Sequence, residues 1–237
     1  MDVNVVCVWW GDKYDISYLE YMKVMVDRSI THPFTLYVYT DRPTEVEALD
    51  NGMQAIPILI KGSHAHMNKY HMWSENVAPN NNPTICFDLD IIIKNNIDRI
   101  FDYIRPGMIT LLDATWSKWI GEDRGIQANS SVMGWIPGTI ERTFQRMYAN
   151  EYEFEMRWNG IDRTLWNEMN DVVCLFESTL AYSRMLGIDE QCNFWVSGGD
   201  YNWECDRDIC IFNGVGLLDM DDYLSVDPYN GFEEYRT

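Results

Sequence analysis

Basic residues are scarce in this sequence of 237 residues. It contains 18 Lys and Arg against 37 Asp and Glu, which gives a formal net charge of −19 at pH 7. Such a charge repels polyanions at long range, so we expect neither a nucleic-acid partner nor attraction to an anionic membrane surface. A small phosphorylated ligand remains compatible with it, because a bound divalent cation reverses the field at short range.

The sequence also lacks the spacing of Cys and His that marks zinc sites. Its six Cys include no CxxC pair, and no His stands beside them at ligand spacing. We therefore expect reduced, mostly buried thiols. His64, His66 and His71 lie close together without a carboxylate partner at helical spacing, so we interpret them as surface or core imidazoles.

Long apolar runs are absent as well. No run approaches the roughly 18 residues of a membrane-spanning helix, and the apolar residues 3–10 lack the basic flank and cleavage site of a secretory leader. We expect no transmembrane segment and a soluble, intracellular protein of the cytoplasm. With no repeat or linker to divide it, the chain is expected to form a single domain over residues 1–237, with an acidic tail at 219–237.

The order of apolar patterns predicts an α/β fold. Residues 3–10 form a β-branched and aromatic run that breaks at Gly11, residues 16–29 have helical spacing, and residues 34–40 form a second strand. A strand, a helix and a strand within about 45 residues make a βαβ unit and favour a parallel sheet. Further strands are predicted at 54–60, 84–93, 107–112, 131–136, 172–176 and 209–212, a helical turn at 97–103, and helices at 141–148 and 162–169.

Two carboxylates interrupt one of these strands. Residues 84–93 read Thr-Ile-Cys-Phe-Asp-Leu-Asp-Ile-Ile-Ile, and alternate residues of a strand share a face, so Asp88 and Asp90 should project together with Leu89 opposite. Like charges this close need neutralisation. Carboxylate oxygens suit Mg²⁺ or Mn²⁺, which keep positions open for phosphate oxygens. The alternative is a solvated strand end with one Asp capping a turn, since D-x-D is frequent by chance.

Several segments, in their order along the chain, resemble the GT-A glycosyltransferases, particularly those related to glycogenin and to bacterial lipopolysaccharide galactosyltransferases. These segments are residues 6–14, residues 34–41, Asn68-Lys69-Tyr70, Phe87-Asp88-Leu89-Asp90, and the stretch from Asn129 to Trp135. The resemblance runs from residue 3 to about residue 214. It implies a single GT-A, Rossmann-like domain with a mixed, mostly parallel sheet flanked by helices.

The resemblance also implies a function and a site. The function is metal-dependent transfer of a sugar from a nucleotide-diphosphate sugar, with UDP as the expected nucleotide, to a hydroxyl of a carbohydrate, lipid-linked or protein acceptor. The site it implies has donor contacts at Val8, Trp9, Tyr14, Asp41, Lys69 and Asp88, Mn²⁺ or Mg²⁺ on Asp88, Asp90 and Asn213, and acceptor-side catalytic residues at Asn129, Ser130 and Asp162.

The sequence departs from this family near its C-terminal end. Asn213 stands where the family usually has a metal-binding His, and no Lys follows Gly214 to meet the diphosphate. An amide oxygen can ligate Mg²⁺ or Mn²⁺ but does not titrate. Lys69 or Arg184 could replace the missing cation, although Lys69 could also be a surface lysine on an amphipathic helix.

Other interpretations remain open at this point. Asp162 could cap the helix 162–169 instead of acting in catalysis, since Asp is favoured in a first turn. The missing His and Lys are also compatible with a catalytically weak sugar-nucleotide-binding protein of the same fold. A D-x-D phosphatase or nucleotidyltransferase is the third alternative, although the sequence does not place the Thr or Ser and the Lys that a phosphatase needs.

Overall fold

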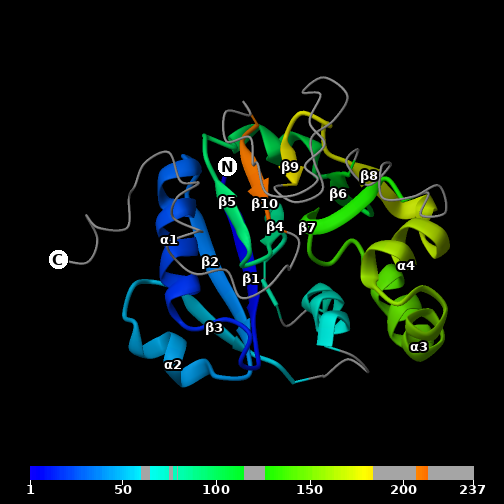
Figure 1. Ribbon diagram of the computed structural model, residues 1–237, viewed down its shortest axis with the longest axis horizontal. Helices are drawn as coiled ribbons and strands as arrows, with labels where there is room; N and C mark the ends of the chain where they lie inside the picture. Colours follow the sequence, from blue (N-terminus) through cyan, green and yellow to red (C-terminus); the bar gives the residue numbers. More distant parts are fainter. Residues whose placement is uncertain (60–64, 75–76, 79, 115–125, 184–206, 213–237) are drawn as a thin grey trace, which may run out of the picture.

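The computed structural model describes residues 1–59, 65–74, 77–78, 80–114, 126–183 and 207–212 (Figure 1). The elements of this part of the chain follow in the order β1 (Val3–Trp9), α1 (Ser17–Ser29), β2 (Phe34–Thr40), α2 (Pro43–Ala48), β3 (Gln54–Pro57), η1 (Ala65–Trp73), β4 (Thr84–Phe87), β5 (Ile91–Ile93), η2 (Asp98–Tyr103), β6 (Ile109–Asp113), β7 (Ala128–Trp135), α3 (Glu141–Trp158), α4 (Ile161–Glu168), η4 (Asn170–Val172), β8 (Val173–Leu175), β9 (Ala181–Ser183) and β10 (Ile209–Ile211).

The predicted βαβ unit is confirmed at the start of the chain. β1 and β2 are parallel, with Val3 opposite Phe34 and Trp9 opposite Thr40. Helix α1 connects them and buries Leu19 and Met22 completely. Its apolar residues recur at intervals of three and four, which places them on one face of the helix.

A seven-stranded sheet forms the centre of the molecule, in the order β3-β2-β1-β4-β7-β6-β8. β7 is antiparallel to both of its neighbours, and the other pairs in this sheet are parallel. This is the mostly parallel α/β sheet that the sequence predicted. Because β1 has β2 on one side and β4 on the other, the strand order reverses between β1 and β4. Open α/β sheets bind ligands at the carboxyl ends of strands at such a switch point.

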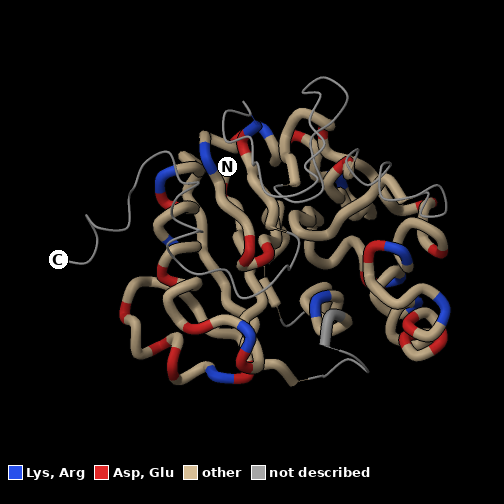
Figure 2. The backbone as a smooth tube through the Cα atoms, in the orientation of Figure 1, with Lys and Arg blue, Asp and Glu red and all other residues tan. Residues whose placement is uncertain are grey.

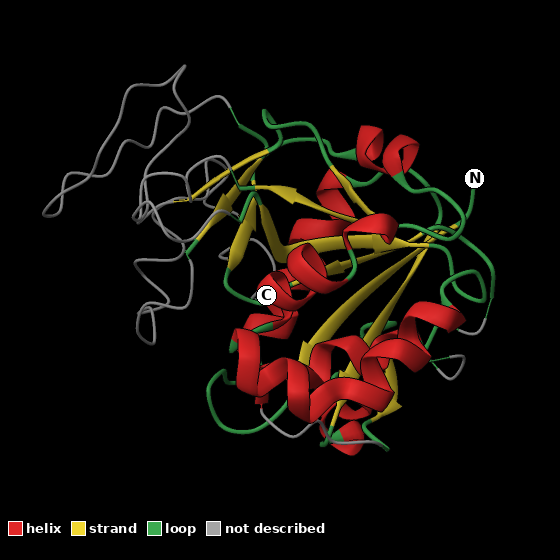
Figure 3. Cartoon of the chain, turned by 90° about the vertical axis from the view of Figure 1, so that its right-hand side faces the viewer, coloured by secondary structure: helices red, strands yellow, loops and turns green. Residues whose placement is uncertain are grey.

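Buried clusters cover both faces of this sheet. Val5 and Cys7 of β1 belong to the cluster that includes α1, whereas Val6 belongs to the cluster that includes η1, α3 and α4. The helices therefore lie on both sides of the strands (Figures 1 and 3). A strand that is buried on both faces needs an almost continuous apolar sequence, which is why residues 3–10 show so little alternation.

The segment 84–93 is not one strand, so this prediction was wrong. β4 ends at Phe87 in the large sheet, and β5 begins at Ile91 in a second sheet of order β5-β10-β9. β5 pairs antiparallel with β10, with Ile92 opposite Cys210. Asp88, Leu89 and Asp90 form the turn that carries the chain from one sheet to the other.

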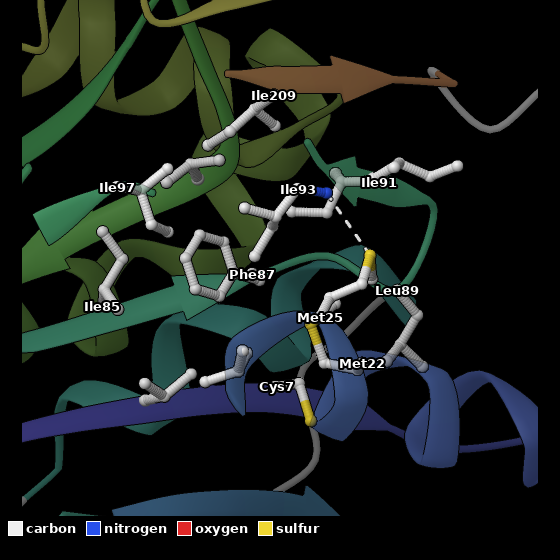
Figure 4. Close-up of a cluster of buried hydrophobic side chains, with 14 of the residues drawn as sticks. Cys7, Met22, Met25, Ile85, Phe87, Leu89, Ile91, Ile93, Ile97 and Ile209 are labelled. Atoms are coloured by element: carbon white, nitrogen blue, oxygen red, sulfur yellow. Dashed lines mark hydrogen bonds between the residues drawn. The ribbon is translucent and has the colours of Figure 1, made fainter. Parts of the chain in front are cut away.

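The small sheet packs against α1 through its isoleucines. In Figure 4, Ile93 and Leu89 lie beside Met22 and Met25 of α1, and Ile209 lies on the other side of Ile93. The backbone nitrogen of Ile93 lies 3.3 Å from Sδ of Met25. Ile91, Ile92 and Ile93 are all buried, so the turn at 88–90 is fixed by apolar packing on its C-terminal side.

Other elements differ from the prediction in extent. The helix predicted at 141–148 extends to Trp158 and ends where Asn159 adopts a left-handed conformation with φ of 50°, which Asn tolerates better than most residues. The helix α2, the 3₁₀ helix η1 and the strand β9 were not among the predicted elements.

The described cysteines agree with the expectation of free thiols. Cys7, Cys86 and Cys210 are buried and Cys174 is half-buried, all without a disulfide, whereas Cys192 and Cys205 lie outside the described residues. Acidic positions outnumber basic ones along the backbone (Figure 2). Among the helices described, none has the length and apolar composition needed to cross a membrane.

Candidate functional site

A cleft of about 580 Å³ opens at the carboxyl ends of β1 and β4, the position that the strand order singles out. Its walls come from the end of β1 and the segment after it, from η1, from the turn after β4, from the start of β7, and from the α3–α4 turn with the first turn of α4. The lining residues are Val8, Trp10, Lys13, Tyr14, Lys69, Asp88, Leu89, Asp90, Asn129, Ser130, Ser131, Asn159, Gly160, Ile161, Asp162 and Arg163. Most of the predicted site residues are therefore brought together in one place.

The antiparallel direction of β7 brings its first residues to this cleft. Phe87, the last residue of β4, is opposite Val132, and the N–H of Asp88 donates a 2.9 Å hydrogen bond to the carbonyl oxygen of Ser131. Because β7 begins where β4 ends, Asn129 and Ser130 lie at the same edge of the sheet as the D-x-D motif.

The two acidic side chains reach the cleft from a turn and not from a strand. Leu89 is only 2% exposed and belongs to the core, although it also contributes to the cleft lining. Asp88 and Asp90 both line the cleft. The N–H of Phe212 donates a 3.0 Å hydrogen bond to the carbonyl oxygen of Asp90, so both ends of the turn are held by strands or their flanking residues. Asp88 and Asp90 therefore face the same cleft, as expected, but the backbone that carries them is a turn and not a strand.

Tyr14 connects the loop after β1 with this acidic turn. Its side chain is hydrogen-bonded to Asp90, and its pKa is raised above the ordinary value by burial and by the negative charges of Asp90 and Asp88. The phenol therefore remains neutral and acts as a hydrogen-bond donor.

Lys69 is the cation nearest to the motif. Its Nζ lies 2.5 Å from Oδ1 of Asp88, 3.1 Å from the carbonyl oxygen of Ser130 and 3.3 Å from Oγ of Ser130. Burial alone would lower the pKa of Lys69, but the charge of Asp88 and the hydrogen bond to it hold that pKa above the ordinary value. The side chain is only 13% exposed, so the alternative of a surface lysine is wrong.

Asp162, in the first turn of α4, is directed toward β7. Its Oδ1 accepts a 2.9 Å hydrogen bond from the N–H of Ser130, and its Oδ2 lies 3.5 Å from Nδ2 of Asn129. Burial raises the pKa of Asp162, against the opposing effects of Lys69 and Ser130. These contacts with β7 contradict the interpretation of Asp162 as a simple helix cap.

Two predicted donor residues lie outside the cleft lining. Trp9 is 1% exposed, and its Nε1 donates a 2.9 Å hydrogen bond to the carbonyl oxygen of Tyr14. Asp41 accepts a 3.3 Å hydrogen bond from the N–H of Gly11. Both side chains therefore hold the loop after β1 in place without lining the cleft. Asn213, the third metal ligand expected from the sequence, lies outside the described residues.

Sequence reasoning missed several residues of the cleft, among them Trp10, Lys13 and Arg163. Trp10 lines it in place of Trp9, and alternation along β1 from Val8 could have identified it. Lys13 has its Nζ 4.6 Å from the centre of the Tyr14 ring. Arg163 has Nη1 3.4 Å from the carbonyl oxygen of Trp158. Neither cation belongs to a pattern that the sequence alone makes visible.

The residues present suit a hard divalent cation. Among the described residues no three His, Cys, Asp or Glu side chains converge as a complete ligand set, but Asp88 and Asp90 supply two carboxylates on one cleft. Mg²⁺ and Mn²⁺ often bind through one or two carboxylates and take their remaining ligands from water and substrate phosphates. The pair therefore fits such a cation, with Asp88 engaged by Lys69 in its absence.

Among known proteins, similarity is found in solved structures and not in sequences. No protein-family model matches the sequence, and no curated protein matches it significantly. Solved glycosyltransferase structures do match, and the chain has the fold of the GT-A glycosyltransferases, as its motifs predicted.

Three of these structures illustrate the similarity. The galactosyltransferase LgtC in complex with donor and acceptor sugar analogs has a TM-score of 0.58 at 11% identity, with 94% of each chain covered. An active-site mutant of LgtC has a TM-score of 0.57 at 12% identity, covering 90% of this chain and 88% of that one. The glycosyltransferase GlyE of Streptococcus pneumoniae TIGR4 has a TM-score of 0.52 at 16% identity and covers 74% of this chain, which spans only 45% of GlyE.

Proposed function

We propose that this chain is a metal-dependent glycosyltransferase that transfers a sugar from a nucleotide-diphosphate sugar, UDP-sugars being the first donors to test, to an acceptor hydroxyl. The observation that supports this most is the convergence of Asp88, Asp90 and Lys69 on one cleft at the switch point of the sheet. In that cleft a pair of carboxylates for a cation lies beside an ammonium group for a phosphate.

The donor side of the cleft combines apolar and polar surfaces. Val8, Trp10 and Tyr14 offer an apolar and aromatic wall for a base and ribose. Asp88 and Asp90 would hold Mn²⁺ or Mg²⁺, which stabilises negative charge on the diphosphate as it leaves. We assign Asn213 as a further ligand, because it directly follows Phe212, whose N–H is bonded to the carbonyl oxygen of Asp90.

The acceptor side would use the residues between β7 and α4. In the reaction, the bond between the anomeric carbon and the diphosphate oxygen breaks and a bond to the acceptor oxygen forms, while the hydroxyl proton passes to a base or to the released diphosphate. Ser130 and Asn129 hold the carboxylate of Asp162 in one orientation. A carboxylate fixed in this way can accept a hydrogen bond from the incoming hydroxyl or from a donor-sugar hydroxyl.

Thermal denaturation with a panel of nucleotide sugars, with and without Mn²⁺, tests this proposal. A ligand that binds the native state raises the midpoint temperature of unfolding. At a ligand concentration of a hundred times its Kd, the free energy of unfolding increases by about 2.7 kcal/mol. We expect a shift with one or more UDP-sugars, and only when Mn²⁺ is present. Sugar transfer or slow hydrolysis of the same donor, followed by chromatography of the released UDP, is the second expected result. A panel without any Mn²⁺-dependent shift would contradict the proposal.

A catalytically weak sugar-nucleotide-binding protein is the second candidate. It is favoured by the lack of a Lys after Gly214 and by the engagement of Lys69 with Asp88, which together leave few free cations for the leaving group. Binding without detectable hydrolysis or transfer would select this candidate. Release of phosphate from simple monoesters would instead favour the D-x-D phosphatase interpretation.

A further inference from the structure

Lys69 has no free N–H in the cleft. Its ammonium group contacts Oδ1 of Asp88 at 2.5 Å and the carbonyl oxygen and Oγ of Ser130 at 3.1 and 3.3 Å. An ammonium group has three N–H donors and no acceptor. These three oxygens account for all of them, so Lys69 can bind a ligand only by giving up one of its present partners.

The contact with Asp88 is the one that a ligand can replace most readily. Ser130 belongs to β7, where its N–H is bonded to Asp162 at 2.9 Å, and its carbonyl oxygen is part of the backbone. Asp88 contributes a carboxylate at the end of a side chain that is 26% exposed toward the cleft. A rotation within the Lys69 side chain can therefore break this contact without any change in the sheet.

This pair conflicts with a divalent cation on the same carboxylate. Oxygen ligands lie about 2.0–2.6 Å from Mg²⁺, Mn²⁺ or Ca²⁺, so a cation on Asp88 would lie within a few ångströms of the Lys69 ammonium group. Like charges at that separation repel, and burial of Lys69 reduces the screening by water. The cation gains the full carboxylate only when Lys69 moves away.

A nucleoside diphosphate supplies the partner that Lys69 would need. Phosphate oxygens accept charge-assisted hydrogen bonds from ammonium groups. The diphosphate alone meets an unfavourable field, because Asp88, Asp90 and Asp162 all line the cleft. The cation therefore neutralises the negative charge that repels the diphosphate. The diphosphate in turn binds the ammonium group of Lys69, which then no longer repels the cation at Asp88.

We propose that Lys69 is the counter-ion of Asp88 in the empty cleft and that it transfers to the diphosphate when a nucleotide enters, which frees Asp88 for the divalent cation. Cation and nucleotide then bind cooperatively, and the charge of Lys69 sets part of that coupling. This inference rests on the proposed metal-assisted binding of a nucleotide sugar and adds to it an exchange of partners at Asp88.

Titration of Mn²⁺, alone and with UDP, into three forms of the full chain tests the exchange, with free Mn²⁺ measured by electron paramagnetic resonance. Lys69→Gln keeps a hydrogen-bond donor beside Asp88 but removes the charge, and it should bind Mn²⁺ alone about tenfold more tightly than the wild type. Lys69→Arg keeps the charge and should resemble the wild type. UDP should increase the Mn²⁺ affinity of Lys69→Gln less than that of the wild type, after correction for chelation of Mn²⁺ by free UDP.

The outcomes separate this inference from the function on which it rests. A wild type that binds neither UDP nor Mn²⁺ when both are present overturns both. Normal binding by the wild type, combined with an unchanged or weaker affinity of folded Lys69→Gln for Mn²⁺ alone, overturns only the exchange.

A measurement on the wild type covers the case in which Lys69→Gln does not fold. In protein with ¹³C-labelled lysine, the side-chain signal assigned by its loss in Lys69→Arg reports the surroundings of Lys69. Mg²⁺ alone should leave this signal nearly unchanged, and Mg²⁺ with UDP should shift it. An equal shift with Mg²⁺ alone, or no shift with both ligands bound, overturns the exchange.

Discussion

The backbone N–H of Ser130 donates a 2.9 Å hydrogen bond to Oδ1 of Asp162. This bond joins the first residues of β7 to the first turn of α4. It also fixes a buried carboxylate beside Lys69, whose charge partly offsets the cost of its burial. This wall of the cleft is therefore tied to the sheet by a hydrogen bond.

Asp162→Asn should reduce sugar transfer at least about tenfold while the fold is retained. The amide oxygen can still accept the bond from Ser130, but the charge is lost. Transfer rates at saturating donor, together with circular dichroism, measure the two effects. Asp162→Ala is the contrast, because it leaves the N–H of Ser130 without its partner and should cost about 1–3 kcal/mol of stability. Equal activity of Asp162→Asn and the wild type would remove Asp162 from the catalytic group.

The stability of Asp162→Asn relative to the wild type should depend on pH. Burial raises the pKa of Asp162 above its ordinary value of 3.8, so the folded state takes up the proton more readily than the unfolded state. This contribution to stability is present at low pH and is lost as the pH rises through the folded pKa. Asn does not titrate, so Asp162→Asn should gain stability relative to the wild type as the pH rises from about 4 to 7. Urea denaturation at several pH values measures it, and parallel curves would contradict it.

Asp90→Asn should weaken the binding of Mn²⁺ and of the donor together, each by about tenfold or more. Its carboxylate lines the cleft beside that of Asp88, and an amide is a poorer ligand for a hard cation. Calorimetric titrations measure both affinities. Asp102→Asn, at an exposed acid of η2 outside the cleft, is the matched control and should bind like the wild type. Donor affinity that is the same in EDTA and in Mn²⁺ would refute a metal role for Asp88 and Asp90.

Replacing Asn213 by the His that the resemblance led us to expect tests the proposed third ligand. An amide does not protonate near neutrality, so the Mn²⁺ affinity of the wild type should show no step typical of a His ligand between about pH 5.5 and 7. Asn213→His should introduce such a step, because the imidazole binds metal only when neutral. Mn²⁺ titrations of both forms across this range measure the difference. Identical pH profiles would place residue 213 away from the cation.

Gly134→Ala should lower the stability by about 1–3 kcal/mol. A Cβ on Gly134 would lie 2.8 Å from Cγ1 and 2.9 Å from Cδ1 of Ile104, and 3.2 Å from Cζ of Phe176. Ile104→Ala removes the two nearest atoms, so the double variant should lose less than the sum of the two single losses. Urea denaturation of all four forms measures this coupling. Strict additivity would show that β7 accommodates the methyl group elsewhere.

The sequence was sufficient where a structure depends on neighbours along the chain. Residues 3–40 have apolar patterns that specify β1, α1 and β2 almost to the residue, because each pattern is complete within its own element. The buried strand that leads into the acidic motif was predictable for the same reason, although the motif itself was expected inside that strand. The resemblance then implied that Asn129 and Ser130 belong to the same site.

The remaining features depend on contacts between distant segments. Nothing in the run 84–93 shows that β5 leaves the large sheet, because the cause is its pairing with β10. The pairing of Lys69 with Asp88 likewise depends on how η1 meets the turn after β4. An apolar run of this kind indicates that a segment is buried, but it does not indicate which segment packs against it.

The pairing of β5 with β10 also determines when the cleft can form. These strands close a loop on the order of a hundred residues, and long-range pairing of this kind is slow in folding because chain entropy is lost before contacts are gained. The large sheet can assemble from earlier segments, but the acidic turn is held on its second side only after Phe212 reaches Asp90. During synthesis on the ribosome, the cleft would therefore be completed late, after β10 has emerged, so an incomplete chain would hold its two carboxylates on a turn that is supported from one side only.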